Sequence, residues 1–325
     1  NNIGVGALSQ LRTTTGTFNL SIGNCTLYCI TTASQNIAIG NSALRVSTAS
    51  ENMAVGHGAL NLNTTGTNNV AVGNSTLRNN TVGSSNTALG RFTLYSNTLG
   101  SQNTAVGTSA LYANTTGICN TAVGAGALQA NTLGDSNVAV GRYALRANTT
   151  GTKNVAVGTL ALCVNTIGYC NTALGHGALR FNTTGIRNTA VGIYSLTSNT
   201  TGERNTALGT QALINNTAGN SNVGIGNNSL FSNTTGTRNI AIGVSAMFAN
   251  TVGTSNVALG AYSLYCNTAS SNTAVGYKSL FFNTTGYSNT AVGINALQNN
   301  TSGFNNVSVG VSALCANTTG RSNVA

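Results

Sequence analysis

Acids and histidines, the side chains most often used in catalysis and metal binding, are scarce in this chain of 325 residues. The only acids are Glu51, Asp135 and Glu203, and the only histidines are His57 and His176. The acids are too far apart in the sequence to form a catalytic carboxylate pair. Neither histidine has a cysteine or an acid at the spacing of a metal-ligand set. We therefore expect a protein that is not an enzyme, with no catalytic residue, no metal and no cofactor.

Basic residues outnumber acids, because 13 Lys and Arg stand against 3 Asp and Glu, for a formal net charge of +10. Charged residues nevertheless make up only 5% of the chain. A nucleic-acid-binding surface contacts many phosphates and needs a denser array of cations than this. The charge balance therefore predicts no nucleic-acid partner and leaves anionic polysaccharide as a candidate ligand.

The spacing of all these residues is set by a short repeat. "NTAVGTSALYANTTGIC" (103–119) is followed directly by "NTAVGAGALQANTLGDS" (120–136), and the same pattern continues in both directions. There are 19 whole units, of 17 residues each except the units at Asn36 and Asn256, which have 16. The units begin at Asn2, Asn19, Asn36, Asn52, Asn69, Asn86, Asn103, Asn120, Asn137, Asn154, Asn171, Asn188, Asn205, Asn222, Asn239, Asn256, Asn272, Asn289 and Asn306. We number positions within a unit from this Asn.

Some positions are fixed and others vary freely. Position 1 is always Asn, position 5 Gly and position 13 Thr, and position 4 is always Val, Ile or Leu. Position 9 is Leu except at Gln10 and Met247, and positions 3 and 8 hold only Ala, Ser, Thr or Gly. Both 16-residue units carry Thr-Ala-Ser (48–50 and 268–270) in the turn that usually reads Thr-Thr-Gly. Such a fixed short period is typical of a repeat architecture.

The repeat predicts an all-β fold rather than helices, because recurrent Gly, Asn and Thr are poor helix formers. We expect strands at positions 1–4 and 8–11, a turn at the position 5 Gly, and a return turn at positions 12–15. One unit is then one coil of a β-solenoid, or β-roll, of about nineteen coils. Coils stacked at ~4.8 Å would give a rod on the order of 90 Å long. We expect residues 1–325 to form a single continuous array that is one stretch of a longer chain or filament.

The fixed Asn and Thr positions suggest side-chain ladders along the axis. Stacked coils place identical residues in a column, where each amide can donate to and accept from the next. We expect such ladders in the position 1 and position 13 columns. Representative members are Asn103, Asn120, Asn137, Thr115, Thr132 and Thr149.

We expect the aliphatic side chains of positions 4 and 9, for example Val106 and Leu111, to fill the core, with Thr108 and Tyr112 partly exposed. Position 3 must then face outward, because neighbouring strand residues point to opposite sides. Its small residues favour close contact between chains. The alternative is that position 3 faces a cramped interior and positions 2 and 4 face elsewhere.

The run from Asn103 to Gly107, Asn-Thr-Ala-Val-Gly, which returns in the same or a closely related form in every unit, resembles the head repeats of trimeric autotransporter adhesins. It is also similar to repeat tracts of bacterial and viral tail-fibre proteins. The resemblance spans the whole chain and implies a left-handed β-roll packed as a homotrimer. The adhesin head units are shorter, and the Asn-Thr-Thr-Gly turn is an addition in this chain.

Several surface features are candidate binding or modification sites. Position 17 carries four cations that are candidate contacts to anionic glycans: Lys153, Arg187, Arg204 and Arg238. Position 10 mixes aromatic residues with Arg45, Arg78, Arg146 and Arg180, a combination that can stack on sugars. Asn-Thr-Thr-Gly turns form eight possible N-glycosylation sequons. Their acceptors are Asn63, Asn114, Asn148, Asn182, Asn199, Asn233, Asn283 and Asn317.

Together these patterns predict a structural fibre or shaft protein, an adhesin stalk or a tail fibre. We expect it outside the cell, on a cell surface or on a virion, with copies of itself as the main partner. This segment contains no stretch that predicts membrane insertion. The alternatives are a non-catalytic adhesin head that binds an anionic polysaccharide or cell-surface glycan, and an ice-binding rod that uses its Thr columns.

Overall fold

The computed structural model describes all residues 1–325 and has β-strands as its only regular elements. The 19 strands are parallel and belong to the successive coils of a β-solenoid, as the repeat predicts. The chain divides into two compact units, residues 1–167 and residues 168–325, which we describe separately. The structure has no helix, and so none with the length and hydrophobicity needed to cross a bilayer.

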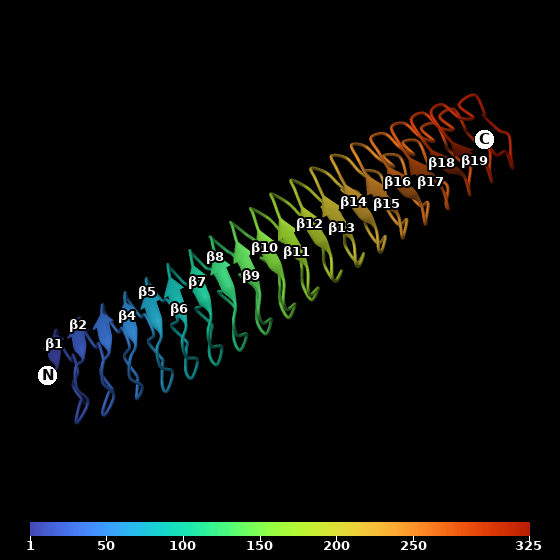
Figure 1. The fold of residues 1–325 in the computed structure, drawn as a ribbon. Helices are drawn as coiled ribbons and strands as arrows, with labels where there is room; N and C mark the ends of the chain where they lie inside the picture. Colours follow the sequence, from blue (N-terminus) through green and yellow to red (C-terminus); the bar gives the residue numbers. More distant parts are fainter. The chain divides into compact units, whose positions relative to one another are not determined.

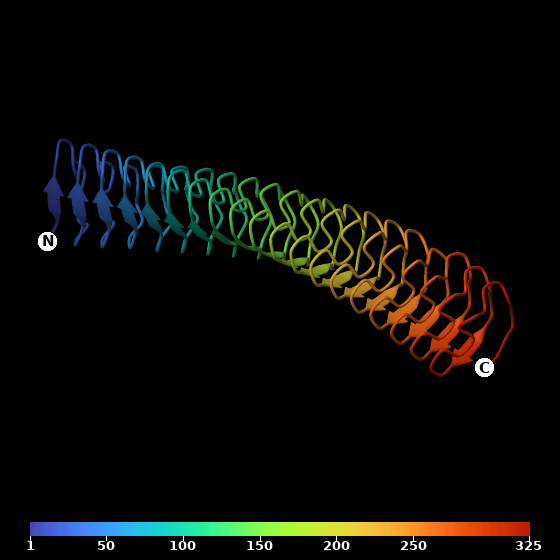
Figure 2. The ribbon, with the colours of Figure 1, turned by 90° about the horizontal axis from the view of Figure 1, so that it is seen from above.

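Each coil contributes one strand of three residues, and the strands of a unit lie in a row along one side of its coils (Figures 1 and 2). The first unit contains β1 (Ile3–Val5), β2 (Leu20–Ile22), β3 (Ile37–Ile39), β4 (Met53–Val55), β5 (Val70–Val72), β6 (Thr87–Leu89), β7 (Thr104–Val106), β8 (Thr121–Val123), β9 (Val138–Val140) and β10 (Val155–Val157). The second contains β11 (Thr172–Leu174), β12 (Thr189–Val191), β13 (Thr206–Leu208), β14 (Val223–Ile225), β15 (Ile240–Ile242), β16 (Val257–Leu259), β17 (Thr273–Val275), β18 (Thr290–Val292) and β19 (Val307–Val309).

Within each unit, every strand pairs with the next strand in sequence, and equivalent positions lie side by side. Ala105 of β7 pairs with Ala122 of β8, and Ala190 of β12 pairs with Ala207 of β13. The register is kept across the 16-residue unit at Asn36, because Ala38 of β3 pairs with Ala54 of β4. The residue missing from the short unit therefore comes out of its turn and leaves the sheet unchanged.

The second strand expected at positions 8–11 is not formed, and this prediction was wrong. Positions 6–11 form consecutive turns in which positions 7 and 9 take positive φ, for example 56° at Ser109 and 50° at Leu111. Their backbone groups still bond between coils: Leu111 N–H donates to Ala127 O at 3.0 Å, and Ala113 N–H donates to Gln129 O at 3.0 Å. The coils are thus held together around their whole perimeter, while only one side is a regular sheet.

The interior also differs from the expected one. Ala105 at position 3 is fully buried, whereas Val106 at position 4 is only half-buried. The outward orientation of position 3 was therefore wrong, and the cramped-interior alternative is correct. Strand alternation explains the reversal, because Asn103 at position 1 also points inward and so fixes positions 2 and 4 on the outside.

Position 9 supplies the large apolar side chain that nearly every coil buries, as expected. Leu111 is 0% exposed, and the small Ala110 at position 8 is buried beside it. A left-handed backbone costs a residue such as Leu roughly 1–2 kcal/mol. Full burial of the side chain contributes about 1.5–3 kcal/mol, which offsets that cost. The Leu column therefore both fills the core and maintains the turn around it.

The position 1 amides form a continuous hydrogen-bonded column through the interior. Asn120 donates to Asn103 Oδ1 from its backbone N–H at 3.0 Å and from Nδ2 at 3.2 Å. The same Nδ2 donates to Gly134 O at 2.8 Å. Asn137 repeats this pattern on Asn120, with 3.0 and 3.2 Å to its Oδ1. The Asn120 amide thus gives both of its donors and accepts two bonds, which satisfies it fully.

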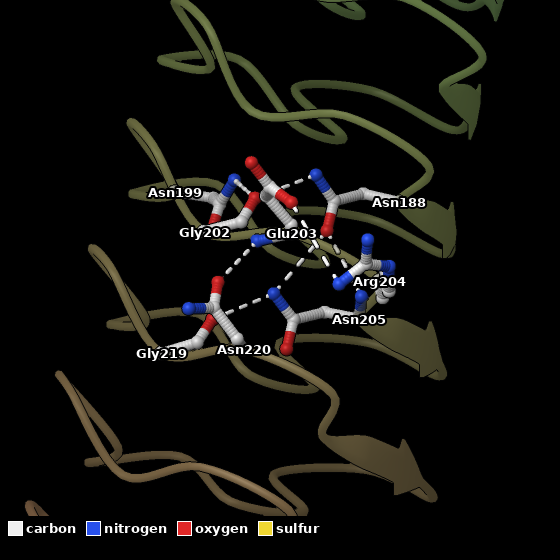
Figure 3. Close-up of polar contacts among 8 residues, drawn as sticks. All are labelled: Asn188, Asn199, Gly202, Glu203, Arg204, Asn205, Gly219 and Asn220. Atoms are coloured by element: carbon white, nitrogen blue, oxygen red, sulfur yellow. Dashed lines mark hydrogen bonds and ion pairs between the residues drawn. The ribbon is translucent and has the colours of Figure 1, made fainter.

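A second amide column runs through position 12, which the sequence analysis had assigned only to a turn. Asn114 Nδ2 donates to Asn97 Oδ1 at 2.8 Å and to Gly117 O at 2.9 Å, and Asn131 Nδ2 donates to Asn114 Oδ1 at 2.9 Å. Figure 3 shows members of both columns in the second unit, where Asn205 Nδ2 donates to Asn188 Oδ1 at 3.2 Å and Asn199 Nδ2 to Gly202 O at 3.0 Å.

The position 13 hydroxyls bond to backbone and not to one another. Thr115 Oγ1 donates to Thr132 O at 3.1 Å, and Thr132 Oγ1 donates to Thr149 O at 3.2 Å. The Thr149 hydroxyl continues the column to the carbonyl of Thr166 at 3.2 Å. These bonds tie each coil to the next at the return turn, and they use the hydroxyl proton of each Thr.

Close stacking explains why position 5 is always Gly. Gly107 has φ of +127°, which L side chains rarely adopt, and a Cβ there would lie 2.8 Å from the backbone of Gly124 in the next coil. The return turn of the short units has a different sequence but keeps the same hydrogen bond. In the unit at Asn36, Ala49 takes the place of the position 15 Gly, and its carbonyl still accepts from Asn36 Nδ2 at 3.1 Å.

Paired substitutions at neighbouring strand positions test which side faces inward. Ala105→Leu should overpack the interior and lower the free energy of unfolding by about 1–3 kcal/mol or more. Val106→Leu should be nearly neutral, because position 4 faces outward and already holds Leu at Leu89 and Leu174. Thermal unfolding followed by circular dichroism compares them. Equal midpoints for the two variants would contradict the assignment.

The amide column is tested by Asn120→Asp, which replaces the donating Nδ2 with an acceptor. The buried carboxylate would face Asn103 Oδ1 and Gly134 O, and leaving such groups unpaired costs about 1–3 kcal/mol or more. The thermal midpoint should fall clearly. Asn74→Asp, at the exposed position 6, adds the same charge and should leave the midpoint nearly unchanged. A drop of the same size in both variants would mean that the column is not what the substitution disturbs.

Candidate functional site

The outer face of the sheet keeps the same character along each unit. Positions 2 and 4 point outward along every strand, and position 4 is Val, Ile or Leu in all of them. Exposure is substantial, since Leu89 is 47% and Leu174 is 48% exposed. Position 2 adds Thr, Val, Ile, Leu or Met, and neither position carries a charge in any unit. The sheet face is therefore an uncharged strip with a continuous aliphatic column.

The strip is comparable in size to the largest apolar patch that a soluble monomer usually exposes, and such patches are often functional. Ten strands at ~4.8 Å spacing and about 10 Å in width present an area on the order of 500 Å² in the first unit alone. Soluble monomers rarely leave contiguous apolar patches larger than a few hundred Å². The apolar position 4 side chains were expected in the core, and this exposed face was therefore not among the predicted sites.

The eight sequon asparagines all lie at position 12. Seven are fully buried, and Asn317 in the last coil is half-buried. In every one, Nδ2 donates to the carbonyl of the Gly three residues later, for example Asn63 to Gly66 at 2.8 Å and Asn283 to Gly286 at 2.7 Å. A glycan on that nitrogen would remove a donor and need space that the coil lacks. The folded chain therefore does not support these residues as glycan acceptors.

The four cations of position 17 are exposed on the turn before the strand. Lys153 lies in the first unit, and Arg187, Arg204 and Arg238 lie in the second. Arg187 and Arg204 occupy adjacent coils, and Arg204 Nη1 is 4.0 Å from Glu203 Oε2 (Figure 3). At such exposure an ion pair contributes little. The arrangement is a sparse row of solvated charges, and it encloses no ligand.

Six of the seven aromatic residues of position 10 stack on one another, and the seventh, Tyr28, lies between Arg12 and Arg45. Phe231, Phe248, Tyr265 and Phe281 form one series in the second unit, with ring centroids 4.8, 5.1 and 5.0 Å apart and nearly parallel planes. Tyr95 and Tyr112 make the same contact at 5.3 Å in the first unit. Sugars stack on ring faces, and here neighbouring rings cover those faces. The stacks are therefore better placed to stabilise the coils than to bind saccharides.

The Thr column expected on an ice-binding surface has its hydroxyl protons engaged between coils. Thr115 Oγ1 donates to Thr132 O at 3.1 Å and Thr132 Oγ1 to Thr149 O at 3.2 Å. Position 14, next along the chain, carries Thr116 in one coil and Leu133 in the next, so it does not form a second regular Thr row. No observation here favours ice binding.

The potentially reactive groups do not gather into a site. Asp135 Oδ1 accepts from Ile118 N–H at 2.7 Å, which ties adjacent coils. His57 and His176 are exposed, and His176 packs edge-on against Tyr194 with centroids 5.2 Å apart. No group of three or more His, Cys, Asp or Glu side chains is close enough to hold a metal ion. All seven cysteines are thiols.

Comparison with models of known protein families gives no match, and comparison with curated proteins gives none either. The functional interpretation therefore depends on the surfaces themselves. Of these, the sheet face is an apolar feature that every coil shares, whereas the exposed residues of positions 6, 7, 10, 11, 16 and 17 vary from coil to coil.

Cysteine labelling checks the placement of two of the thiols. Burial raises the pKa of the Cys266 thiol, so less of it is thiolate at a given pH, and thiolate is the reactive form. Cys119 is exposed at position 17. At about pH 8, maleimide should modify Cys119 faster than Cys266, and peptide mapping by mass spectrometry measures both rates. Equal rates in the folded chain would contradict this, with the unfolded chain as the control in which the two converge.

Proposed function

We propose that this chain is a non-catalytic structural fibre protein whose copies associate side by side through their sheet faces. The observation that carries the proposal is the uncharged aliphatic column at position 4, present in every coil and exposed to 47% at Leu89. Burying this column removes apolar surface from water, at about 25 cal/mol per Å². The gain is repeated at every coil, so it grows with the length of the array.

A second copy of the same chain is the partner that fits this face best. A contact that repeats at every coil requires a partner with the same axial spacing, and another copy has that spacing by construction. The face also lacks charge, so two copies meet without burying unpaired ions. The small side chains of position 3 are buried inside the coil and keep it thin. They therefore take no part in the proposed contact between copies.

The assembly that we propose is a homotrimer. Three copies around one axis is the arrangement that the resemblance to trimeric adhesin heads and tail fibres implies. A closed cyclic assembly covers the face of every copy, whereas an open one leaves faces exposed and continues to grow. The position 17 cations and position 10 aromatic residues remain at the surface in this arrangement.

An extended filament of this kind belongs outside the cell, on a cell surface or a virion, as a shaft, stalk or tail fibre. The supporting features are the uniform coils, the low charge and the absence of a clustered reactive group among the described residues. A role as a glycan-binding adhesin head needs a defined saccharide site in addition, which the outer sheet face does not provide.

Charge on the sheet face should separate the copies without unfolding the chain. In the double variant Leu89→Lys and Val123→Lys, two outward side chains of the first unit become cationic. Light scattering coupled to size-exclusion chromatography should give about three times 32.7 kDa for the parent chain and a mass near 32.7 kDa for the variant. Circular dichroism should remain that of the parent.

Leu99→Lys with Leu133→Lys is the matched control, because both residues are 52% exposed at position 14 and lie away from the sheet. This variant should keep the mass of the parent. A parent chain that is monomeric at micromolar concentration, or a control variant that dissociates equally, would overturn the proposal.

A further inference from the structure

The turns at positions 10 and 11 of the first unit, away from the sheet face, contain a hollow of about 450 Å³. Its lining residues come from positions 10 and 11 of three successive coils: Gln129, Ala130, Arg146, Ala147, Cys163 and Val164. A smaller hollow of about 220 Å³ adjoins it and shares Gln129 and Arg146. The larger one is within the range of sites for small ligands, about 300–1,000 Å³.

The hollow exists because bulky side chains are missing from this stretch. Position 11 is Ala at Ala130 and Ala147, and position 10 holds Gln129 where the two preceding coils have the stacked rings of Tyr95 and Tyr112. Position 7 is Gly126, and a Cβ there would come within 2.6 Å of the Tyr143 ring. Gly126 thus lets Tyr143 lie against the coil, where both residues line the smaller hollow.

Two guanidinium groups flank that tyrosine. The Arg142 guanidinium carbon is 4.7 Å from the centre of the Tyr143 ring, and that of Arg146 is 4.9 Å from it. Arg146 Nε also donates to Gln129 Oε1 at 3.3 Å, which orients its guanidinium at the junction of the two hollows. Both arginines are exposed, so the charge is accessible to a ligand.

No carboxylate neutralises this pair. The single ion pair in the structure joins Glu203 and Arg204, and the one acid of the preceding coil, Asp135, is bonded to Ile118 N–H. The Nη groups of Arg146 therefore remain as donors in a planar fork, the geometry that matches a carboxylate or a sulfate. A cationic fork beside a small apolar hollow suits a ring that carries an acidic group.

We propose that this hollow binds an acidic saccharide residue. Its carboxylate or sulfate lies on Arg146 with Arg142 alongside, and its ring occupies the space over Ala130 and Ala147. Tyr143 supplies an aromatic wall in the adjoining smaller hollow, and Gln129 Nε2 is a donor to a ring hydroxyl. The site is separate from the sheet face at positions 2 and 4, so it is open in the single chain and in the proposed fibre.

Isothermal titration of the full chain tests this site with three tetrasaccharides. One is derived from heparin and carries sulfates and carboxylates, one is derived from hyaluronan and carries carboxylates alone, and cellotetraose carries no charge. At least one acidic probe should bind and cellotetraose should not. Comparison of the two acidic probes decides whether the carboxylate suffices or the sulfate is needed.

Two variants remove different parts of the site. Arg146→Gln should weaken binding about tenfold, because it removes a charge-assisted contact. Ala147→Phe should abolish binding by filling the hollow without changing the charge. The scaffold accepts this residue at position 11, where Phe181 and Phe282 occur naturally.

Arg91→Gln is the matched control. Arg91 lies over Phe92 at 4.4 Å in the same two positions as Arg142 and Tyr143, and neither Arg91 nor Phe92 lines either of the two hollows. This variant loses the same charge and should bind like the parent. Absence of binding by both acidic probes, unchanged affinity in Ala147→Phe, or an equal loss in Arg91→Gln would overturn the proposal. None of these outcomes bears on the mass of the assembly, so the fibre proposal stands or falls separately.

Discussion

The hydrogen-bonded register between successive coils is the constraint on which the rest of this structure depends. Asn120 gives its backbone and side-chain donors to Asn103 Oδ1, and Thr115 gives its hydroxyl to Thr132 O in the next coil. Polar groups buried inside such a thin coil are costly unless they are paired, and here each finds its partner one unit away. A coil out of register would leave both amide columns unpaired, so the repeat must keep its length or lose residues only in the turn.

The same register turns every position of the unit into a column on the surface. An aliphatic residue at position 4 becomes a continuous strip, and an aromatic residue at position 10 becomes a stack such as Phe231 on Phe248. A surface feature specific to a few coils arises where the residue type of a column changes. Small residues at Ala130 and Ala147 open the hollow beside Arg146. A repeat protein of this kind can thus combine a uniform face suited to self-association with a binding site confined to a few coils.

Two surfaces with different chemistry follow from this arrangement. The sheet face is uncharged and repeats in every coil, which suits a partner with the same period. The hollow carries a cationic side chain, Arg146, and is formed by three successive coils, which suits a small acidic ligand. Because one lies on the strands and the other on the turns, a fibre held together by the first leaves the second open to solvent.

The sequence by itself determined the coil, its length and the columns, because a strict period permits only stacked units with equivalent positions side by side. It also indicated Leu111 as core and Asn103 as a stacking residue. Which way the strand faces was decided only by the tertiary structure. Val106 is the more apolar residue, yet the amide of Asn103 needs buried partners, and strand alternation then puts Ala105 inside and Val106 outside. The hollow could not be predicted from the sequence either, because Arg146, Ala147 and Tyr143 form the proposed site only together with Gln129 of the neighbouring coil.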